Sequence, residues 1–153
     1  MITLTRTDSS NLDFQRLVTL LDNYLEEIDG DEHDFFSQFN HNNNLDYVVL
    51  AYKDGECIGS GAMESFDAET MEIKRIFVLE TARRLGAASQ VMDELEKWTV
   101  ELGYKNSICE TGIVQNDSVK LYFKRGYHII PNYGHYQGFG SSICFKKVLQ
   151  NPA

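Results

Sequence analysis

The chain has 153 residues, with the apolar and charged fractions of an ordinary globular protein, which is enough for one domain, residues 1–153, with a sizeable core. Its formal net charge of -9 argues against a nucleic-acid partner, which requires a basic face, and against adhesion to an anionic membrane. Small molecules remain as partners, cationic ones among them, although solubility alone accounts for such a charge.

The sequence predicts neither a secretory signal nor a membrane span. Residues 1–10 lack the apolar core of a secretory signal, and no run approaches the roughly 18 apolar residues of a membrane span. Cys57, Cys109 and Cys144 are odd in number, far apart and without a C-x-x-C pair. We therefore expect small buried side chains rather than disulfides, a zinc site or a catalytic thiol. A cytoplasmic location fits these features.

The first third of the chain predicts a strand, a helix and a loop. Residues 1–6 alternate between apolar and polar side chains, as in a strand. From Ser10 the apolar residues fall at spacings of three and four, which predicts an amphipathic helix to about Ile28. Residues 29–44 are acidic, then aromatic, then rich in amides, and predict a loop with one short helix.

The middle of the chain predicts three consecutive strands. Two apolar runs in residues 46–66 flank the sequence Lys53-Asp54-Gly55, which is a strong hairpin signal. Residues 67–70 make a second turn, and residues 71–80 form the third strand.

The rest predicts a helix, a strand, a second helix and final strands. The first of these helices runs to about Leu102, with Gly103 as its stop. Its inner face is marked by Val91, Leu95, Trp98 and Leu102. A strand follows over residues 105–113, a short helix over 116–127, and a last strand over 141–149. Hairpins followed by helix crossovers predict a single α/β domain with a mixed, mostly antiparallel sheet and helices on both faces.

The helix that follows the third strand begins without an obvious cap. Residues 83–88, RRLGAA, stand where a Ser, Thr or Asp is usual, and they match neither G-x-x-x-x-G-K-[ST] nor G-x-G-x-x-G. Amides of a first helical turn lack intrahelical partners, and the helix dipole favours an anion there. Small residues would let a diphosphate approach the backbone closely. The stretch predicts either a phosphate site or a simple turn.

Residues 83–88 contain Arg83, Gly86 and Ala88, and residues 116–127 contain Asn116, a Leu121-Tyr122 pair and Gly126 followed by Tyr127. Together these two motifs resemble the GNAT superfamily of acyl-CoA-dependent N-acetyltransferases. That family has an Arg/Gln-x-x-Gly-x-Gly/Ala loop between a strand and a long helix. About thirty residues later it has Asn, a Leu-Tyr pair and Gly followed by an aromatic residue. The resemblance covers essentially the whole chain, most sharply residues 70–127, and departs from the family at Arg84, where Gly is frequent.

The resemblance implies acetyl-CoA as cosubstrate and no metal. The pyrophosphate would bind the amides of Arg84, Leu85, Gly86, Ala87 and Ala88, with Arg83 beside it. The pantetheine arm would follow the preceding strand at Phe77 and Val78, where the family strand splays away from its neighbour at a bulge. A backbone N–H there would stabilise the oxyanion that develops on the thioester carbonyl.

The resemblance also implies catalytic groups. Tyr122 would donate a proton to the departing CoA thiolate, and Asn116 would orient the cofactor's amide groups, cap its helix, or do both. Glu72 matches a strand glutamate used as a base in the histone-modifying branch, and Glu110 is the other candidate. Each glutamate could instead be a solvated or salt-bridged residue, and Tyr122 a core residue. The four histidines, His33, His41, His128 and His135, share no metal-ligand spacing.

The acceptor remains open at this point. In such folds, segments corresponding to residues 26–40 and 131–142 select it. Here the first is acidic with aromatic residues, and the second is rich in tyrosine and glycine. Such walls suit a cationic amine, whether a small molecule or a peptide, although both segments could be ordinary solvated loops. Two alternatives to catalysis are a non-catalytic acyl-CoA-binding or regulatory module and an acidic surface for a basic protein. Related domains often pair as homodimers.

Overall fold

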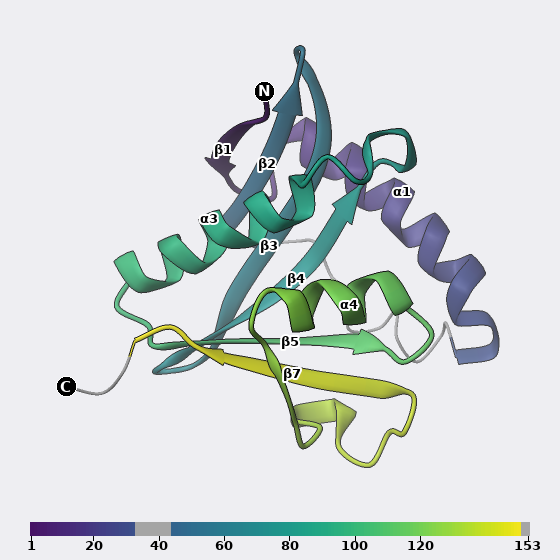
Figure 1. The fold of residues 1–153 in the computed structure, drawn as a ribbon, viewed down its shortest axis with the longest axis vertical. Helices are drawn as coiled ribbons and strands as arrows, with labels where there is room; N and C mark the ends of the chain where they lie inside the picture. Colours follow the sequence, from purple (N-terminus) through teal and green to yellow (C-terminus); the bar gives the residue numbers. More distant parts are fainter. Residues whose placement is uncertain (33–43, 151–153) are drawn as a thin grey trace.

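The computed structural model describes residues 1–32 and 44–150, and within them seven strands form one sheet with helices on both faces (Figure 1). The strands are β1 (Thr3–Thr7), β2 (Tyr47–Lys53), β3 (Glu56–Asp67), β4 (Thr70–Val78), β5 (Asn106–Gly112), β6 (His128–Ile130) and β7 (Ser142–Val148). The α-helices are α1 (Leu12–Asp29), α3 (Ala87–Glu101) and α4 (Asn116–Lys124), and short 3₁₀ turns are η1 (Gly30–Glu32), η2 (Glu80–Ala82) and η3 (Gly134–Tyr136). No helix in the described residues is long and apolar enough to cross a bilayer.

The sheet is mixed and mostly antiparallel, which confirms the predicted fold class. Its strand order is β1-β2-β3-β4-β5-β7-β6, and only β4 and β5 pair in parallel. Their pairing stops after three residue pairs, the last of which joins Glu72 to Ile108. Because β4 continues to Val78 and β5 to Gly112, the two strands diverge and leave a split in the middle of the sheet (Figure 1).

A bulge in β4 lies beside this split. Ala62 of β3 pairs with Lys74, but Ser60 pairs with Phe77, so two residues of β4 oppose one residue of β3. The bulged residue Arg75 has a φ of +58°, a left-handed conformation that costs a non-glycine residue about 1–2 kcal/mol. Ser60 Oγ donates a hydrogen bond to the Arg75 carbonyl at 3.2 Å, and the buried guanidinium forms an ion pair with Asp22 of α1. These contacts hold the bulge in place.

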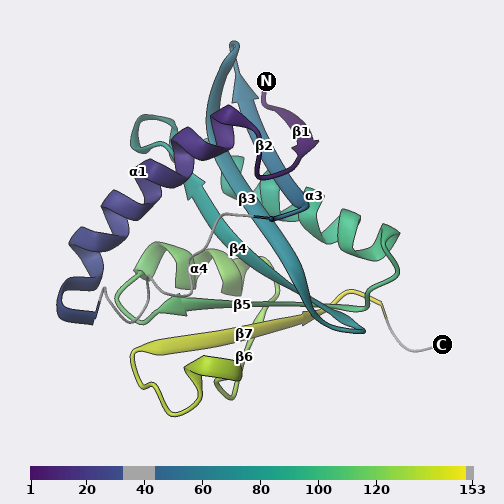
Figure 2. The same ribbon diagram turned by 180° about the vertical axis from the view of Figure 1, so that it is seen from behind.

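The two faces of the sheet have separate cores. Helix α1 covers one face, and α3 and α4 cover the other (Figure 2). Phe14, Leu17 and Val18 of α1 are buried against β2 and β3, as the helical spacing predicted. On the opposite face α3 packs so closely that a Cβ at Gly61 would lie 2.6 Å from Val91 Cγ1. Gly61 therefore allows the close approach of α3 to the sheet.

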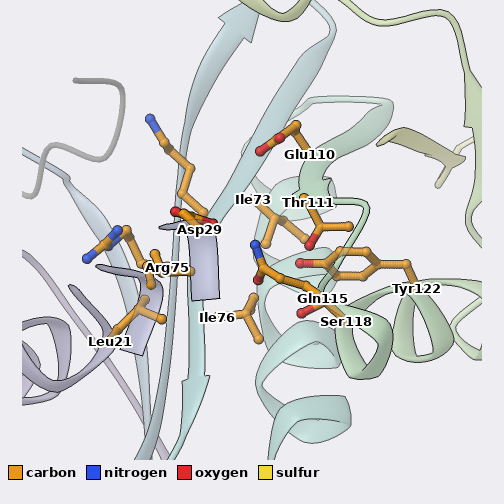
Figure 3. Close-up of a pocket in the computed structure, with 13 residues that line it drawn as sticks. Leu21, Asp29, Ile73, Arg75, Ile76, Glu110, Thr111, Gln115, Ser118 and Tyr122 are labelled. Carbon is orange, nitrogen blue, oxygen red and sulfur yellow. The ribbon is translucent and has the colours of Figure 1, made fainter. Parts of the chain in front are cut away.

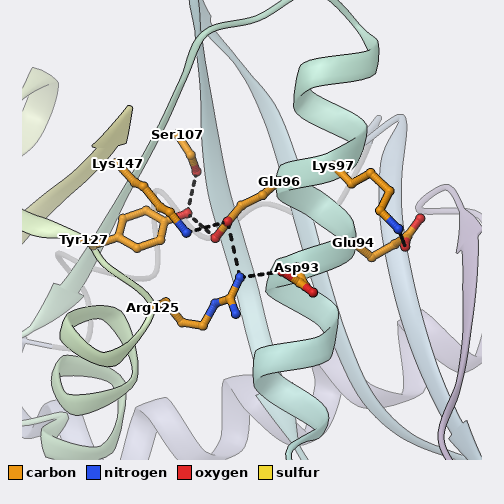
Figure 4. Close-up of polar contacts among 8 residues, drawn as sticks. All are labelled: Asp93, Glu94, Glu96, Lys97, Ser107, Arg125, Tyr127 and Lys147. Atoms are coloured by element: carbon orange, nitrogen blue, oxygen red, sulfur yellow. Dashed lines mark hydrogen bonds and ion pairs between the residues drawn. The ribbon is translucent and has the colours of Figure 1, made fainter. Parts of the chain in front are cut away.

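A buried ionic network, which we call the Glu96 cluster, joins α3 to α4 and β7 (Figure 4). The Glu96 carboxylate is 7 % exposed and accepts hydrogen bonds from Lys147 Nζ at 2.8 Å and from Arg125 at 3.3 Å. The Tyr127 hydroxyl lies 3.1 Å from this carboxylate and 2.9 Å from Ser107 Oγ. The cluster fixes the position of the chain that follows α4.

Local details confirm most of the sequence-based elements. Asp54 and Gly55 both have positive φ, +52° and +81°, as the hairpin turn requires. All three cysteines are free and buried. One assignment was wrong: Leu102, expected on the inner face of its helix, is 37 % exposed. Of the predicted 29–44 loop, residues 33–43 lie outside the described part of the chain.

Candidate active site

A cavity of about 80 Å³ lies at the split between β4 and β5 (Figure 3). Elements from both faces of the sheet contribute to its walls, because the split joins the two faces. The lining residues are Leu21, Leu25 and Asp29 of α1, Ile73, Lys74, Arg75 and Ile76 of β4, Glu110, Thr111 and Gly112 of β5, and Gln115, Ser118 and Tyr122 around α4. The cavity brings together two of the predicted catalytic residues, Tyr122 and Glu110.

The Tyr122 side chain reaches the cavity from α4 (Figure 3). Its ring is 5 % exposed and packs against Phe145, with the ring centroids 5.4 Å apart. Burial raises the pKa of the phenol well above its ordinary value of 10, and the nearby Cys109 and Glu110 raise it further. The hydroxyl therefore keeps its proton throughout the physiological pH range and can act as a hydrogen-bond donor.

Glu110 is the carboxylate that lines the cavity. Burial raises its pKa to about 7, and the charges of Glu72 and Asp29 add to the increase. Ser142 Oγ donates a hydrogen bond to the carboxylate at 2.7 Å, which opposes part of this shift. A carboxyl group with a pKa near 7 changes its protonation state around neutral pH, which suits a general base.

Glu72 occupies a different position from Glu110. It is 9 % exposed, does not line the described cavity, and accepts a hydrogen bond from the Tyr133 hydroxyl at 2.9 Å. Its charge nevertheless raises the pKa of Glu110, so the two carboxylates lie within electrostatic range across the split. The two base candidates therefore belong to one electrostatic system.

The two segments expected to select the acceptor, residues 26–40 and 131–142, contact each other in their described parts. Ser141 Oγ of the β6–β7 connection donates a hydrogen bond to Glu32 of η1 at 2.9 Å. In the same connection Tyr133 packs edge-on against Phe66, with the ring centroids 5.1 Å apart. The described parts of the two segments thus bring acidic and aromatic residues together, although none of these four residues lines the cavity. Residues 33–40 of the first segment, including His33, lie outside the described residues, as does His41.

The N-terminus of α3 lacks a side-chain cap, as the sequence indicated. Its N-cap residue Gly86 has a φ of +83°, and a Cβ there would meet only Gln90 Nε2, at 4.0 Å. Ala87 is buried, Ala88 is half-buried, and Leu85 is 46 % exposed. The first-turn amides and the open space around Gly86 fit an anion that approaches the backbone.

The two arginines of this loop have different surroundings. Arg83 Nε donates a hydrogen bond to the Val78 carbonyl at 3.3 Å, and its guanidinium lies 5.7 Å from the centroid of the Tyr24 ring. Arg84 is exposed and has a φ of +70°. Glycine adopts this left-handed conformation without strain, so Arg84 is less favourable here than the glycine that is frequent at this position in the family.

The predicted pantetheine positions lie beyond the bulge of β4. Phe77 and Val78 pair with Ser60 and Gly59 of β3, whereas no residue of β5 pairs with β4 beyond Glu72 in the described sheet. One backbone edge of β4 therefore faces the split. Strand-like pairing with a ligand is available at this edge.

Asn116 does not cap α4 as proposed. It is the first residue of the helix and is exposed, whereas the N-cap is Gln115, and no side chain makes a capping hydrogen bond. Asn116 therefore lies one position beyond the cap, inside the first turn of the helix. The cofactor-orienting role of Asn116 stays a prediction.

Sequence reasoning missed several polar residues of the cavity, among them Thr111, Gln115 and Ser118. Thr111 follows Glu110 and so points to the opposite face of β5. Ser118 precedes Tyr122 by four residues, which places both on one face of α4. The two periodicities could have marked Thr111 and Ser118. Among the described residues no group of three or more His, Cys, Asp or Glu side chains is arranged to hold a metal ion.

The split sheet, the bulge beside it and the uncapped helix define an acyl-CoA N-acyltransferase fold. Residues 14–127 match the model of the acetyltransferase (GNAT) family, and the chain belongs to that family. It is accordingly an acetyl-CoA-dependent acyltransferase.

Similar proteins agree with this assignment. The chain is 29 % identical over 103 residues to an IAA acetyltransferase of Azospirillum brasilense, a match that covers 66 % of this chain and 67 % of the relative. A Klebsiella pneumoniae structure assigned as an acyl-CoA N-acyltransferase superposes with a TM-score of 0.82 at 22 % identity, covering 98 % and 99 % of the two chains. A GNAT family acetyltransferase from Elizabethkingia anophelis, with acetyl-CoA bound, gives 0.69 at 20 % identity over 96 % and 97 %. These two structures share the fold.

Proposed function

We propose that this protein transfers the acetyl group of acetyl-CoA to a primary amine by direct attack within a ternary complex. The observation that carries the proposal is the cavity at the split, where Tyr122 and Glu110 line a common space. One side of the reaction needs a proton acceptor for the amine, and the other needs a donor for the leaving sulfur. The two residues supply these opposite functions.

The cofactor side of the site is formed by the α3 loop and the end of β4. Backbone amides of residues 84–88 hold the pyrophosphate, and the charge of Arg83 adds to their attraction. The free edge of β4 at Phe77 and Val78 pairs with the pantetheine arm and presents an N–H to the thioester oxygen. Asn116 orients the amide groups of the cofactor. Holding both substrates in a near-attack arrangement supplies several kcal/mol of the barrier.

The acceptor side removes a proton from the amine. A primary amine of lysine type is protonated at pH 7, and only the neutral form attacks. Glu110 takes this proton before the amine nitrogen bonds to the carbonyl carbon, and its pKa of about 7 suits the role. After the attack the nitrogen loses its second proton to water. The C–S bond then breaks, and Tyr122 donates to the departing sulfur. Glu72 is the second candidate base, and its charge attracts the ammonium form of the acceptor.

The acceptor is a primary amine on a small molecule or peptide, and the surroundings favour a cationic one. Asp29 and Glu110 line the cavity, and Glu72 and Tyr133 stand on the same side of the sheet. Carboxylates attract an ammonium by Coulomb interaction, and aromatic faces attract it by cation–π contact. The similar proteins described above share only 20 % to 29 % sequence identity with this chain, so no acceptor of theirs is assigned to it.

Calorimetric titration with acetyl-CoA tests the cofactor site, with Gly86→Glu as the disabling variant. The new carboxylate stands where the pyrophosphate binds, so affinity should fall on the order of 100-fold, or about 2.7 kcal/mol. Gly103→Glu is the matched control, because Gly103 also has a positive φ and open space but lies at the other end of α3. Equal affinity of the two folded variants would place the phosphates elsewhere. A panel of amines, assayed for CoA release, then tests the transfer.

A further inference from the structure

The hydroxyl of Thr111 is buried in the wall of the catalytic cavity without a protein partner. The residue is 3 % exposed, and its Oγ1 makes no hydrogen bond in the described residues. Leaving a buried hydroxyl without a partner costs about 1–3 kcal/mol. A valine would fill the same space without this cost. The hydroxyl therefore needs an explanation outside the packing of the protein.

Thr99 is a second buried threonine, and its hydroxyl has a hydrogen-bond partner within the protein. It is fully buried on α3, and its hydroxyl donates to the Leu95 carbonyl at 2.8 Å. Both threonines belong to the α3 and α4 side of the sheet, yet only Thr99 has its hydroxyl satisfied within the helix. The difference indicates that the partner of Thr111 is a molecule that enters the cavity.

The direction of the Thr111 side chain determines whether its hydroxyl lies near the proposed proton donor or near the proposed base. Side chains alternate along β5, so Cys109 and Thr111 face α4, whereas Glu110 faces Ser142 on the other side. The hydroxyls of Thr111 and Tyr122 point into the same part of the cavity (Figure 3). Thr111 thus stands on the side of the proposed proton donor, away from the proposed base.

We propose that the Thr111 hydroxyl is a second hydrogen-bond donor, beside Tyr122, to the sulfur of CoA as the C–S bond breaks. This inference rests on the proposed function. As the bond breaks, its electron pair stays on the sulfur, and the thiolate receives the Tyr122 proton. In a cavity of low dielectric a developing charge gains much from donors that are already in place. Two donors share the charge that one phenol would otherwise carry alone.

The pKa of the thiol of bound CoA tests this role without knowledge of the acceptor. Ultraviolet absorbance of the thiolate is followed during a pH titration of the CoA complex. A hydrogen bond to a charged group is worth about 1.5–3 kcal/mol, so Thr111→Val should raise the pKa of the bound thiol by about one unit or more. The protein's own thiols do not obscure the signal, because burial raises the pKa of Cys57 and Cys144 to about 11 and that of Cys109 higher still.

Three further variants separate a hydrogen bond to sulfur from a structural effect. Thr111→Ser keeps the hydroxyl and should keep the wild-type thiol pKa. Thr99→Val removes a buried hydroxyl elsewhere and should leave the thiol pKa unchanged. If valine at position 111 prevents folding, Thr111→Ala replaces it, because alanine removes the hydroxyl without adding bulk. Thermal melting of each variant confirms that it is folded.

The outcomes distinguish this inference from the proposed function. Failure of the wild-type protein to bind CoA would overturn the proposed function and the inference together. Normal CoA binding, with the same thiol pKa in wild type and Thr111→Val, would overturn only the role of Thr111. A raised pKa in Thr111→Val that Thr111→Ser restores supports the second donor.

Discussion

Two buried polar regions flank the Tyr122 helix, and they treat their polar groups in opposite ways. In the Glu96 cluster one carboxylate receives Lys147, Arg125 and the Tyr127 hydroxyl, all within 3.3 Å (Figure 4). In the cavity at the split, the Thr111 hydroxyl has no hydrogen bond to any described residue. In the first region the Glu96 carboxylate is fully paired within the protein, although the buried Nε of Arg125 has no partner among the described residues. In the second region we propose that a ligand supplies the missing partner.

The contrast separates residues that stabilise the fold from residues proposed for catalysis, although Tyr122 and Arg125 are close together in the sequence. Satisfied buried groups hold α3, α4 and β7 together, and losing one partner leaves the others desolvated. Unsatisfied groups reduce stability and are retained where they bind something. Variants of the Glu96 cluster should therefore change the free energy of unfolding, and variants of the cavity should change catalysis.

The largest effect is expected for Glu96→Gln. The variant leaves Arg125 and Lys147 without their shared negative charge, and both are partly buried. We expect a loss of about 3 kcal/mol in the free energy of unfolding, measured by urea denaturation. Glu101→Gln is the control, since Glu101 is half-exposed on the same helix and pairs with Arg6. A loss no greater than that of the control would show that the cluster adds little stability.

The next largest effect should distinguish two buried tyrosines. Tyr122→Phe removes the proposed donor to sulfur and should lower kcat on the order of 100-fold, with little change in the free energy of unfolding. Tyr127→Phe removes a hydroxyl that lies within hydrogen-bond distance of Glu96 and Ser107, and should lower stability while kcat stays near wild type. Steady-state kinetics with an acceptor from the amine panel gives the first quantity. Equal losses of kcat in the two variants would contradict the claim that the cavity affects catalysis and the Glu96 cluster affects stability.

A smaller effect is expected in the pH dependence of Glu110→Gln. Burial raises the pKa of Glu110 from 4.5 to about 7, so its stabilising contribution is present below about pH 4.5 and is lost as the pH rises through 7. The variant lacks this loss. A pKa that moves from 4.5 to about 7 corresponds to at most about 3.4 kcal/mol, and solvent reduces this because Glu110 is only partly buried. The stability of the variant relative to wild type should therefore rise across that window by about 2 kcal/mol, measured by urea denaturation at several pH values.

The activity of the same variant provides a second readout. In the wild type, kcat/KM should rise with pH around 7 as Glu110 ionises, and this limb should be absent in Glu110→Gln. Glu72→Gln should keep a limb but move it to lower pH, because the charge of Glu72 raises the pKa of Glu110. If the limb disappears only in Glu72→Gln, Glu72 is the base.

The smallest expected effect compares the two buried threonines in the free protein. Thr111→Val should leave the free energy of unfolding unchanged or raise it by up to about 1 kcal/mol, because it removes an unpartnered hydroxyl. Thr99→Val breaks a hydrogen bond to Leu95 and should lower stability by about the same amount. Calorimetric melting without ligand measures both. A clear loss in Thr111→Val would mean that the hydroxyl already has a partner in the free protein.

Features encoded by local spacing were predictable from the sequence. The 12–29 helix, the Asp54-Gly55 hairpin and the missing cap at Gly86 depend on neighbouring residues, and all three were correct. The fold class followed from the order of these elements. The loop at residues 83–88 was recognisable as a candidate phosphate site because its small residues and its place between a strand and a helix have a local physical meaning.

Features that depend on distant contacts were not predictable to the same degree. The bulge fell on Arg75, whose left-handed backbone is supported by Ser60 and Asp22 from other elements. Glu72 and Glu110 were both named as bases, but only their surroundings in three dimensions separate the carboxyl that lines the cavity from the one that Tyr133 holds. The missing partner of Thr111 is likewise a property of packing, which no pattern of spacing reports.

The short pairing between β4 and β5 has a consequence for hydrogen exchange. Beyond Glu72, β4 pairs with β3 along one edge, and no described strand covers its other edge. Amide protons on this open edge should exchange rapidly with deuterated water, whereas those bonded to β3 should be slow. Once acetyl-CoA is bound, slowing restricted to residues 73–78 and the first turn of α3 would trace the ligand along the backbone. The opening in the sheet thus allows the bound ligand to be located by deuterium exchange of the protein's own backbone amides.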